Sequence, residues 1–114
     1  MLVSNGRIIT SSVEENGEIA TFHTFLTHLT AHLVLDVRRT TDVRVPLDVF
    51  ISSRGRPSES QWSVRARMEA DEDLVELVVK NGRNGEWFCG ISFTSNVNST
   101  RVVGFSIAMN ATSK

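Results

Sequence analysis

Four arginines and one tryptophan form the most distinctive group of chemically capable residues in this sequence. Arg54 and Arg56 lie in a polar loop, whereas Arg65 and Arg67 share one face of the strand predicted around and after Trp62. Guanidinium groups grip phosphates with forked hydrogen bonds, and an indole ring offers a stacking surface. These five residues are therefore the predicted ligand-binding site. The alternative is an arginine face that is solvated or contacts another subunit.

A second group, His28, His32 and Asp36, has a spacing of four residues. On a helix such residues share a face and could chelate a metal ion, but on a strand four residues span about 13 Å and cannot. Because this segment reads better as a strand, we expect no metal site and no cofactor, and these three residues are only weak candidates. The acids within residues 71–76 lack the spacing of a calcium loop, and a solvated turn is expected there.

No catalytic motif stands out in the sequence. It contains neither a glycine-flanked serine elbow nor a glycine-rich phosphate loop. Cys89 alternates with apolar residues, so we expect a buried structural thiol and not a nucleophile. A small enzyme would have to pair His23 or His28 with a carboxylate from another strand, and no catalytic residue is predicted.

Alternating apolar and polar residues predict most of the strands. The clearest strand covers residues 43–51 and contains Pro46. Proline cannot donate a ladder hydrogen bond, so this strand is expected at a sheet edge or beside a bulge. The same alternation recurs over residues 62–70, 87–93 and 103–109.

Segments 20–32 and 71–80 fit both a helix and a strand. Regularly spaced threonines in the first and three valines in the second favour strands. A short helix at either place is the alternative. If the first segment is a strand, Phe25, Leu33 and Val37 share its buried face.

Four Asn-Gly dipeptides occur in the chain. Asn-Gly suits the type I′ turn of a β-hairpin, which predicts one hairpin at Gly17 and another at residues 81–85. About seven short strands joined by hairpins predict an all-β, mainly antiparallel fold, either a small β-sandwich or a barrel. The length of 114 residues suits a single β domain over residues 1–114.

Composition narrows the expected partners and location. The formal charge of −1 argues against nucleic acid, and no apolar run approaches the roughly 20 residues of a membrane-spanning helix. The N-terminal residues do not resemble a secretory signal, and the one cysteine cannot form an intrachain disulfide. We therefore expect a cytoplasmic protein that does not enter a membrane.

Apolar residues on the outward faces of the last two strands carry the leading functional prediction. Phe88, Val102 and Ala108 make these faces less polar than a lone small domain needs, which indicates cover by another subunit. The leading prediction is a non-catalytic binding or structural module that forms homo-oligomers through a sheet face or edge, as a phage or virus component would. The second prediction is a small-ligand or carbohydrate binder that uses Trp62 or Trp87, and the third is a small enzyme. A different protein is the alternative to a second copy as the partner.

Overall fold

Eight β-strands make up the regular structure of the described residues. The computed structural model describes residues 7–26, 32–53, 64–80, 85–95 and 101–112. No helix is present in these ranges, and hence none that could span a membrane. The predicted all-β, antiparallel fold is confirmed. The strands are β1 (Ile8–Glu14), β2 (Ala20–Leu26), β3 (His32–Arg39), β4 (Leu47–Ser52), β5 (Val64–Met68), β6 (Leu74–Val79), β7 (Gly85–Ser92) and β8 (Val102–Thr112).

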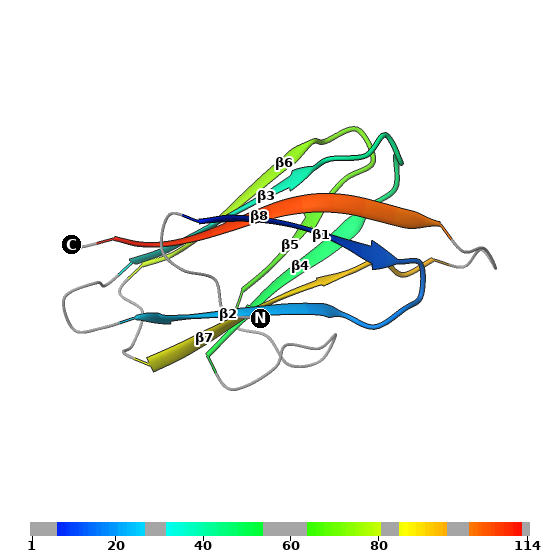
Figure 1. The fold of residues 1–114 in the computed structure, drawn as a ribbon. Coiled ribbons are helices and arrows are strands. Elements are labelled where there is room, and N and C mark those ends of the chain that lie inside the picture. The colour runs from blue at the N-terminus through cyan, green and yellow to red at the C-terminus, as the bar shows by residue number, and fades with distance from the viewer. Residues whose placement is uncertain (1–6, 27–31, 54–63, 81–84, 96–100, 113–114) are drawn as a thin grey trace.

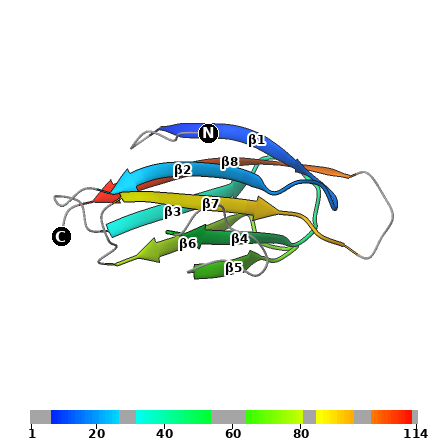
Figure 2. The same cartoon turned by 90° about the horizontal axis from the view of Figure 1, so that it is seen from below.

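The strands form two antiparallel sheets of four. The first sheet has the order β1-β8-β3-β6 and the second sheet the order β2-β7-β4-β5. Consecutive strands change sheet at every step except from β4 to β5, which pair with each other. This is the arrangement of a jelly roll, a two-sheet sandwich of eight strands. Figures 1 and 2 show the sheets stacked, with β1 beside β2 at one edge and β6 beside β5 at the other.

Both predicted Asn-Gly hairpins are wrong. Asn16 and Gly17 connect β1 to β2, which belong to different sheets. Asn16 has a φ of 57°, but Gly17 has no positive φ, so the pair lacks the two left-handed residues of a type I′ turn. Gly85, with a φ of 120°, begins β7 after a strand of the other sheet, and residues 81–84 lie outside the described ranges. Asn16-Gly17 therefore lies where the chain passes from one sheet to the other, and Gly85 begins a strand just after such a passage.

One hydrophobic core lies between the sheets. The ring centroids of Phe22 on β2 and Phe105 on β8 lie 5.9 Å apart with an interplanar angle of 88°, an edge-to-face contact that joins the two sheets. That this core belongs to one domain over residues 1–114 stays a prediction. The inward faces predicted for the last two strands are confirmed, because all their members are buried: Trp87, Cys89, Ile91, Phe93, Val103, Phe105, Ile107 and Met109.

The described residues of the two ambiguous segments contain strands and no helix. Within residues 71–80 the strand β6 replaces the alternative helix, and within residues 20–32 the described parts belong to β2 and the start of β3. Residues 27–31 lie outside the described ranges. Phe25 is 53% exposed, so its predicted burial is wrong. That prediction assumed one continuous strand, but two strands in different sheets have independent registers.

Pro46 has a different role from the predicted one. Strand β4 begins directly after it, at Leu47, and lies inside the second sheet between β7 and β5. The placement of this strand at an edge or bulge is therefore wrong. Proline lacks an N–H donor, so it fits the position just before the ladder begins.

A buried arginine secures the end of β3. The Arg39 guanidinium donates hydrogen bonds to the carbonyl oxygens of Glu69, at 3.1 Å, and Glu72, at 3.2 Å. Burial is the main reason that the pKa of Arg39 is lowered, with the nearby charge of Arg44 as a second cause. These bonds tie β3 to the turn between β5 and β6.

Candidate functional site

The sandwich has two outer faces, and they differ in chemistry. We call the outer face of the second sheet the arginine face, because Arg65 and Arg67 project from it. We call the outer face of the first sheet the small-residue face. It takes this name because Gly104, Ser106 and Ala108 follow one another on the outer side of its interior strand β8.

The two described arginines of the predicted site have different surroundings. Arg65 Nη2 lies 3.3 Å from Asp48 Oδ1, and the guanidinium carbon lies 5.6 Å from the centre of the Phe50 ring. Both of these partners are buried although they lie on the outer face. Arg67 has only a contact of 4.0 Å with Glu69 among the described residues. Arg65 is therefore engaged within the domain, whereas Arg67 is only weakly paired among the described residues, and its part in ligand binding stays a prediction.

The other members of the predicted site are not brought together here. Arg54, Arg56 and Trp62 lie outside the described residues, so their part in ligand binding stays a prediction. Trp87 is 5% exposed and packs in the core. Its indole cannot serve as an open stacking platform, so the alternative that used Trp87 is wrong.

Sequence reasoning missed an aromatic strip on the arginine face. His23 lies with its ring centroid 6.0 Å from that of Phe25 and 6.1 Å from that of Phe88. Phe25 and His23 are alternate residues of β2, and Phe88 pairs with His23 across to β7. The signal in the sequence was the alternation of these residues with Phe22 and Thr24, but it depended on the register of β2.

The same strip contains the histidine of the enzyme alternative. His23 Nε2 lies 3.8 Å from Glu86 Oε2, with the side chains 27% and 40% exposed. This distance is longer than a hydrogen bond. Among the described residues no hydrogen bond reaches His23, so nothing there orients it as a catalytic base. An enzyme based on His23 stays a prediction, and His28 lies outside the described ranges.

The weak metal candidates lie along one strand. His32 begins β3, and Asp36 lies four residues further on the same outer side, about 13 Å away at the rise of a strand. His28 is outside the described residues. No three His, Cys, Asp or Glu side chains come together in the described part of the chain. In the acidic turn, Asp73 pairs with Arg44.

Cys89 is a fully buried thiol, as predicted. Desolvation by the surrounding core raises its pKa far above the ordinary value. A thiol that stays protonated is a poor nucleophile. Cys89 therefore contributes packing to the core.

The small-residue face carries most of the exposed apolar side chains. Ile8, on β1, is 70% exposed and stands at the rim of a pocket of about 260 Å³. Ser106 and Ala108 line this pocket, since their short side chains leave a depression along β8. Four of the five large hydrophobic residues that are exposed in the described chain lie on this face: Ile8, Leu74, Val78 and Val102.

The predicted second apolar face of the last two strands is split between the two sides of the molecule. Phe88 lies on the arginine face, whereas Val102 and Ala108 lie on the small-residue face. The reason is that β7 and β8 belong to different sheets. The apolar character is real, but its members do not form one surface.

Charges on the small-residue face are poorly matched within the domain. Asp36 on β3 lies directly opposite Glu76 on β6, and like charges in opposed positions destabilise a sheet. Arg38 is two residues from Asp36, on the same outer side, and both residues line the pocket beside Ile8. Asp36, Glu76 and Arg38 form no ion pair within the described residues.

The fold defines the class of this protein as an antiparallel β-sandwich of jelly-roll topology. No protein-family model matches the chain, and no curated protein sequence matches it. The chain is similar in structure to the pre-peptidase C-terminal domain of collagenase from Bacillus anthracis. The TM-score is 0.68 at 8% sequence identity, over 96% of this chain and 92% of that one.

It is also similar to PliG from Aeromonas hydrophila, a periplasmic inhibitor of g-type lysozyme. Here the TM-score is 0.54 at 13% identity, over 92% of this chain and 84% of that one. At such identities the likeness establishes the fold alone. Because PliG is periplasmic, the likeness gives no support to a cytoplasmic location, which stays a prediction.

Proposed function

We propose that this protein is a non-catalytic structural or binding module that self-associates through its small-residue face. The observation that carries the proposal is the exposed Ile8 at the rim of a pocket on the same face. In a dimer with two-fold symmetry the same patch meets itself. A projecting side chain beside a depression can therefore fill the depression of the second copy, and the second copy fills the first.

The charges of this face support the same occupant. An approach that sets Arg38 of one copy against Asp36 of the other forms two equivalent ion pairs across the two-fold axis. These pairs would also offset the repulsion between Asp36 and Glu76 within each copy. The unmatched charges are thus complementary to a second copy of the chain.

The size of the face suits a small dimer interface. Its four strands β1, β8, β3 and β6 have 7, 11, 8 and 6 residues, and at about 3.3 Å per residue and about 4.8 Å between strands they give a flat area of roughly 500 Å². This area is less than the about 800 Å² that each partner buries in a standard interface, but two such faces reach the roughly 1,000 Å² expected of a weak biological interface. One structural neighbour adds an analogy. PliG is named as an inhibitor of a lysozyme, so a sandwich of this kind can bind another protein.

Sedimentation velocity over about 1 to 100 µM protein tests the proposal. The wild-type chain should sediment faster as its concentration rises, and Ile8→Glu should remain a monomer. Phe25→Glu is the matched control, because Phe25 is an exposed apolar residue on the opposite face. A wild-type monomer at every concentration, or equal loss of association in both variants, would contradict the proposal.

A further inference from the structure

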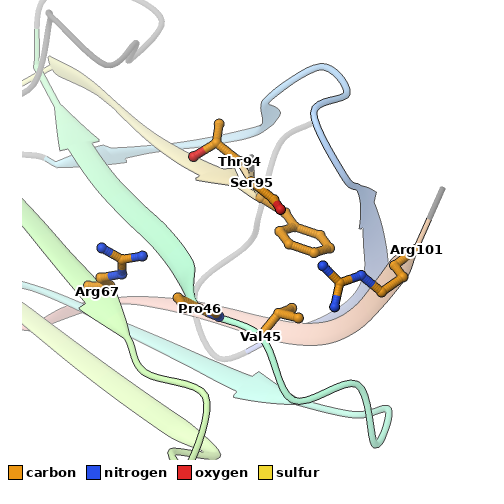
Figure 3. A pocket seen from close by; sticks show the side chains of 7 residues that line it. Val45, Pro46, Arg67, Thr94, Ser95 and Arg101 are labelled. Carbon is orange, nitrogen blue, oxygen red and sulfur yellow. The ribbon is translucent and has the colours of Figure 1, made fainter. Parts of the chain in front are cut away.

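A second pocket, of about 430 Å³, opens at one end of the sandwich (Figure 3). It lies where β7 ends, where the chain enters β4 and where β8 begins. Val45, Pro46 and Phe93 supply its apolar wall, and Arg67, Arg101 and Thr94 supply hydrogen-bond donors. No acidic residue is found among its described lining residues.

Arg101 is held firmly in place at this pocket. Its Nε and Nη2 donate hydrogen bonds to the two carboxylate oxygens of Glu15, at 3.1 and 2.7 Å, and the Glu15 side chain is fully buried. The hydrogen bonding of the Arg101 guanidinium to the Glu15 carboxylate is the main reason that the pKa of Arg101 is raised. The guanidinium carbon also lies 5.5 Å from the centre of the Phe93 ring. Glu15 thus balances the charge of Arg101, and Nη1 of Arg101 makes no hydrogen bond among the described residues.

Arg67 supplies the charge that is not balanced. Its guanidinium lies on the opposite side of the pocket from Arg101 in Figure 3, and its side chain is 52% exposed. The contact with Glu69, at 4.0 Å, is at the limit of an ion pair and involves a Glu69 side chain that is also exposed. Such a pair contributes little and is easily replaced by a better acceptor.

The geometry points to this pocket as a site for a carboxylate carried on an apolar or peptide chain. One unbalanced guanidinium matches a ligand with one negative charge, and a carboxylate fits its fork with two parallel hydrogen bonds. The Thr94 hydroxyl and the Arg101 guanidinium are further donors in the same pocket, and they suit other polar groups of such a ligand, such as a peptide carbonyl oxygen. The wall of Val45, Pro46 and Phe93 fits an apolar group next to the carboxylate, which a bare phosphate ion does not have.

This inference does not depend on self-association. Arg67 belongs to the second sheet, whereas the small-residue face belongs to the first. Variants of Ile8 should therefore leave the pocket unchanged, and variants of Arg67 should leave the oligomeric state unchanged.

NMR titration of the isotope-labelled chain tests the site. N-acetyl-leucine should shift the backbone amide signals of Thr94, Ser95 and Arg101, with saturation, and N-acetyl-leucinamide should not. Arg67→Ala should weaken binding of the acid at least tenfold, roughly 1.4 kcal/mol. Arg65→Ala is the matched control, because it removes an arginine from the same strand face but outside the pocket.

Other probes define the source of the carboxylate. Binding of N-acetyl-leucine supports the terminal carboxylate of a peptide, and tighter binding of an amidated peptide that carries glutamate supports an acidic side chain. Equal binding of the acid and the amide would overturn the inference. So would equal weakening by Arg65→Ala and Arg67→Ala, or tighter binding of inorganic phosphate than of either carboxylate.

Discussion

The two outer faces of this sandwich differ in how their charged and apolar side chains are paired within one copy. On the arginine face, Arg65 covers the buried Phe50 and pairs with Asp48, so charge and apolar surface around Arg65 are matched within the domain, whereas Arg67 is only weakly paired. On the small-residue face, Ile8 is exposed beside a pocket, and Asp36 lies opposite another acid. This difference is the reason that we propose the small-residue face, and not the arginine face, as the surface that meets a second copy.

A hydrophobic core lies between the two faces, and the rate at which thiol reagents label the buried Cys89 measures how often this core opens to solvent. Thiol reagents should label the native protein at least about a thousandfold more slowly than the unfolded protein, because a typical folded domain opens only rarely. The thiolate is the reactive form, and burial raises its pKa. Raising the pH from 7 to 9 should therefore accelerate labelling of the unfolded chain, and labelling of the native protein, which proceeds through rare opening, should stay about a thousandfold slower at both pH values. Rapid native labelling that rises with pH would show that the core is open to solvent.

The small-residue face is covered by Thr40 and Thr41 at Gly104, and it is open further along β8, at Ser106. A Cβ atom added to Gly104 would lie 2.7 Å from Thr40 Oγ1 and 2.8 Å from Thr41 Cγ2. The Gly104 backbone N–H also donates to Thr41 Oγ1 at 2.9 Å, which holds that side chain in place. Gly104→Val should lower the free energy of unfolding by about 2 kcal/mol, measured by urea denaturation.

Ser106→Ala, two residues along on the same side of β8, is the control. It should change the free energy of unfolding by less than about 0.5 kcal/mol, since Ser106 lines the open pocket. Equal effects of the two substitutions would show that the two ends of this face do not differ as described.

Substitutions of one aspartate on each face test whether its charge is paired within one copy. Asp48 lies on the arginine face and Asp36 on the small-residue face. Asp48→Ala should lower the free energy of unfolding by about 1 kcal/mol, because it leaves Arg65 without its partner, and should not change self-association. Asp36→Ala should leave stability within about 0.5 kcal/mol of wild type but weaken self-association several-fold. Urea denaturation and sedimentation of both variants measure the two effects. The reverse pattern would exchange the roles assigned to the two faces.

Salt concentration tests the proposed ion pairs between the two copies. Raising NaCl from about 0.05 to 0.5 M should weaken self-association by about threefold to tenfold, because it screens the proposed pairs between Asp36 and Arg38. The free energy of unfolding of Ile8→Glu, as a monomer, should change less over the same range. Self-association that strengthens strongly with salt would indicate an interface without these ion pairs.

Local patterns predicted the strands better than their connections. Alternation identified the buried residues of β7 and β8, because one periodic rule holds along a whole strand. It misplaced Phe25, since β2 and β3 lie in different sheets and do not share a register. The Asn-Gly turns were read as hairpins because turn chemistry does not reveal which sheet receives the next strand.

The candidate sites show the same limit. Arg67 could be singled out from its residue type, and it lines a pocket. Its companion Arg101 could not, because their proximity depends on where β5 and β8 begin and end in the folded sandwich. The match between Ile8 and its pocket likewise depends on the pairing of β1 with β8.

A charge-exchange series observed by sedimentation velocity tests the central claim most directly. Asp36→Arg and Arg38→Asp should each weaken self-association at least tenfold, roughly 1.4 kcal/mol, because each sets like charges against each other across the two-fold axis. The double variant should regain association close to that of wild type, since the two charges have only changed places. If the double variant associates no better than the weaker single variant, or if neither single variant weakens association, the small-residue face is not the self-association surface.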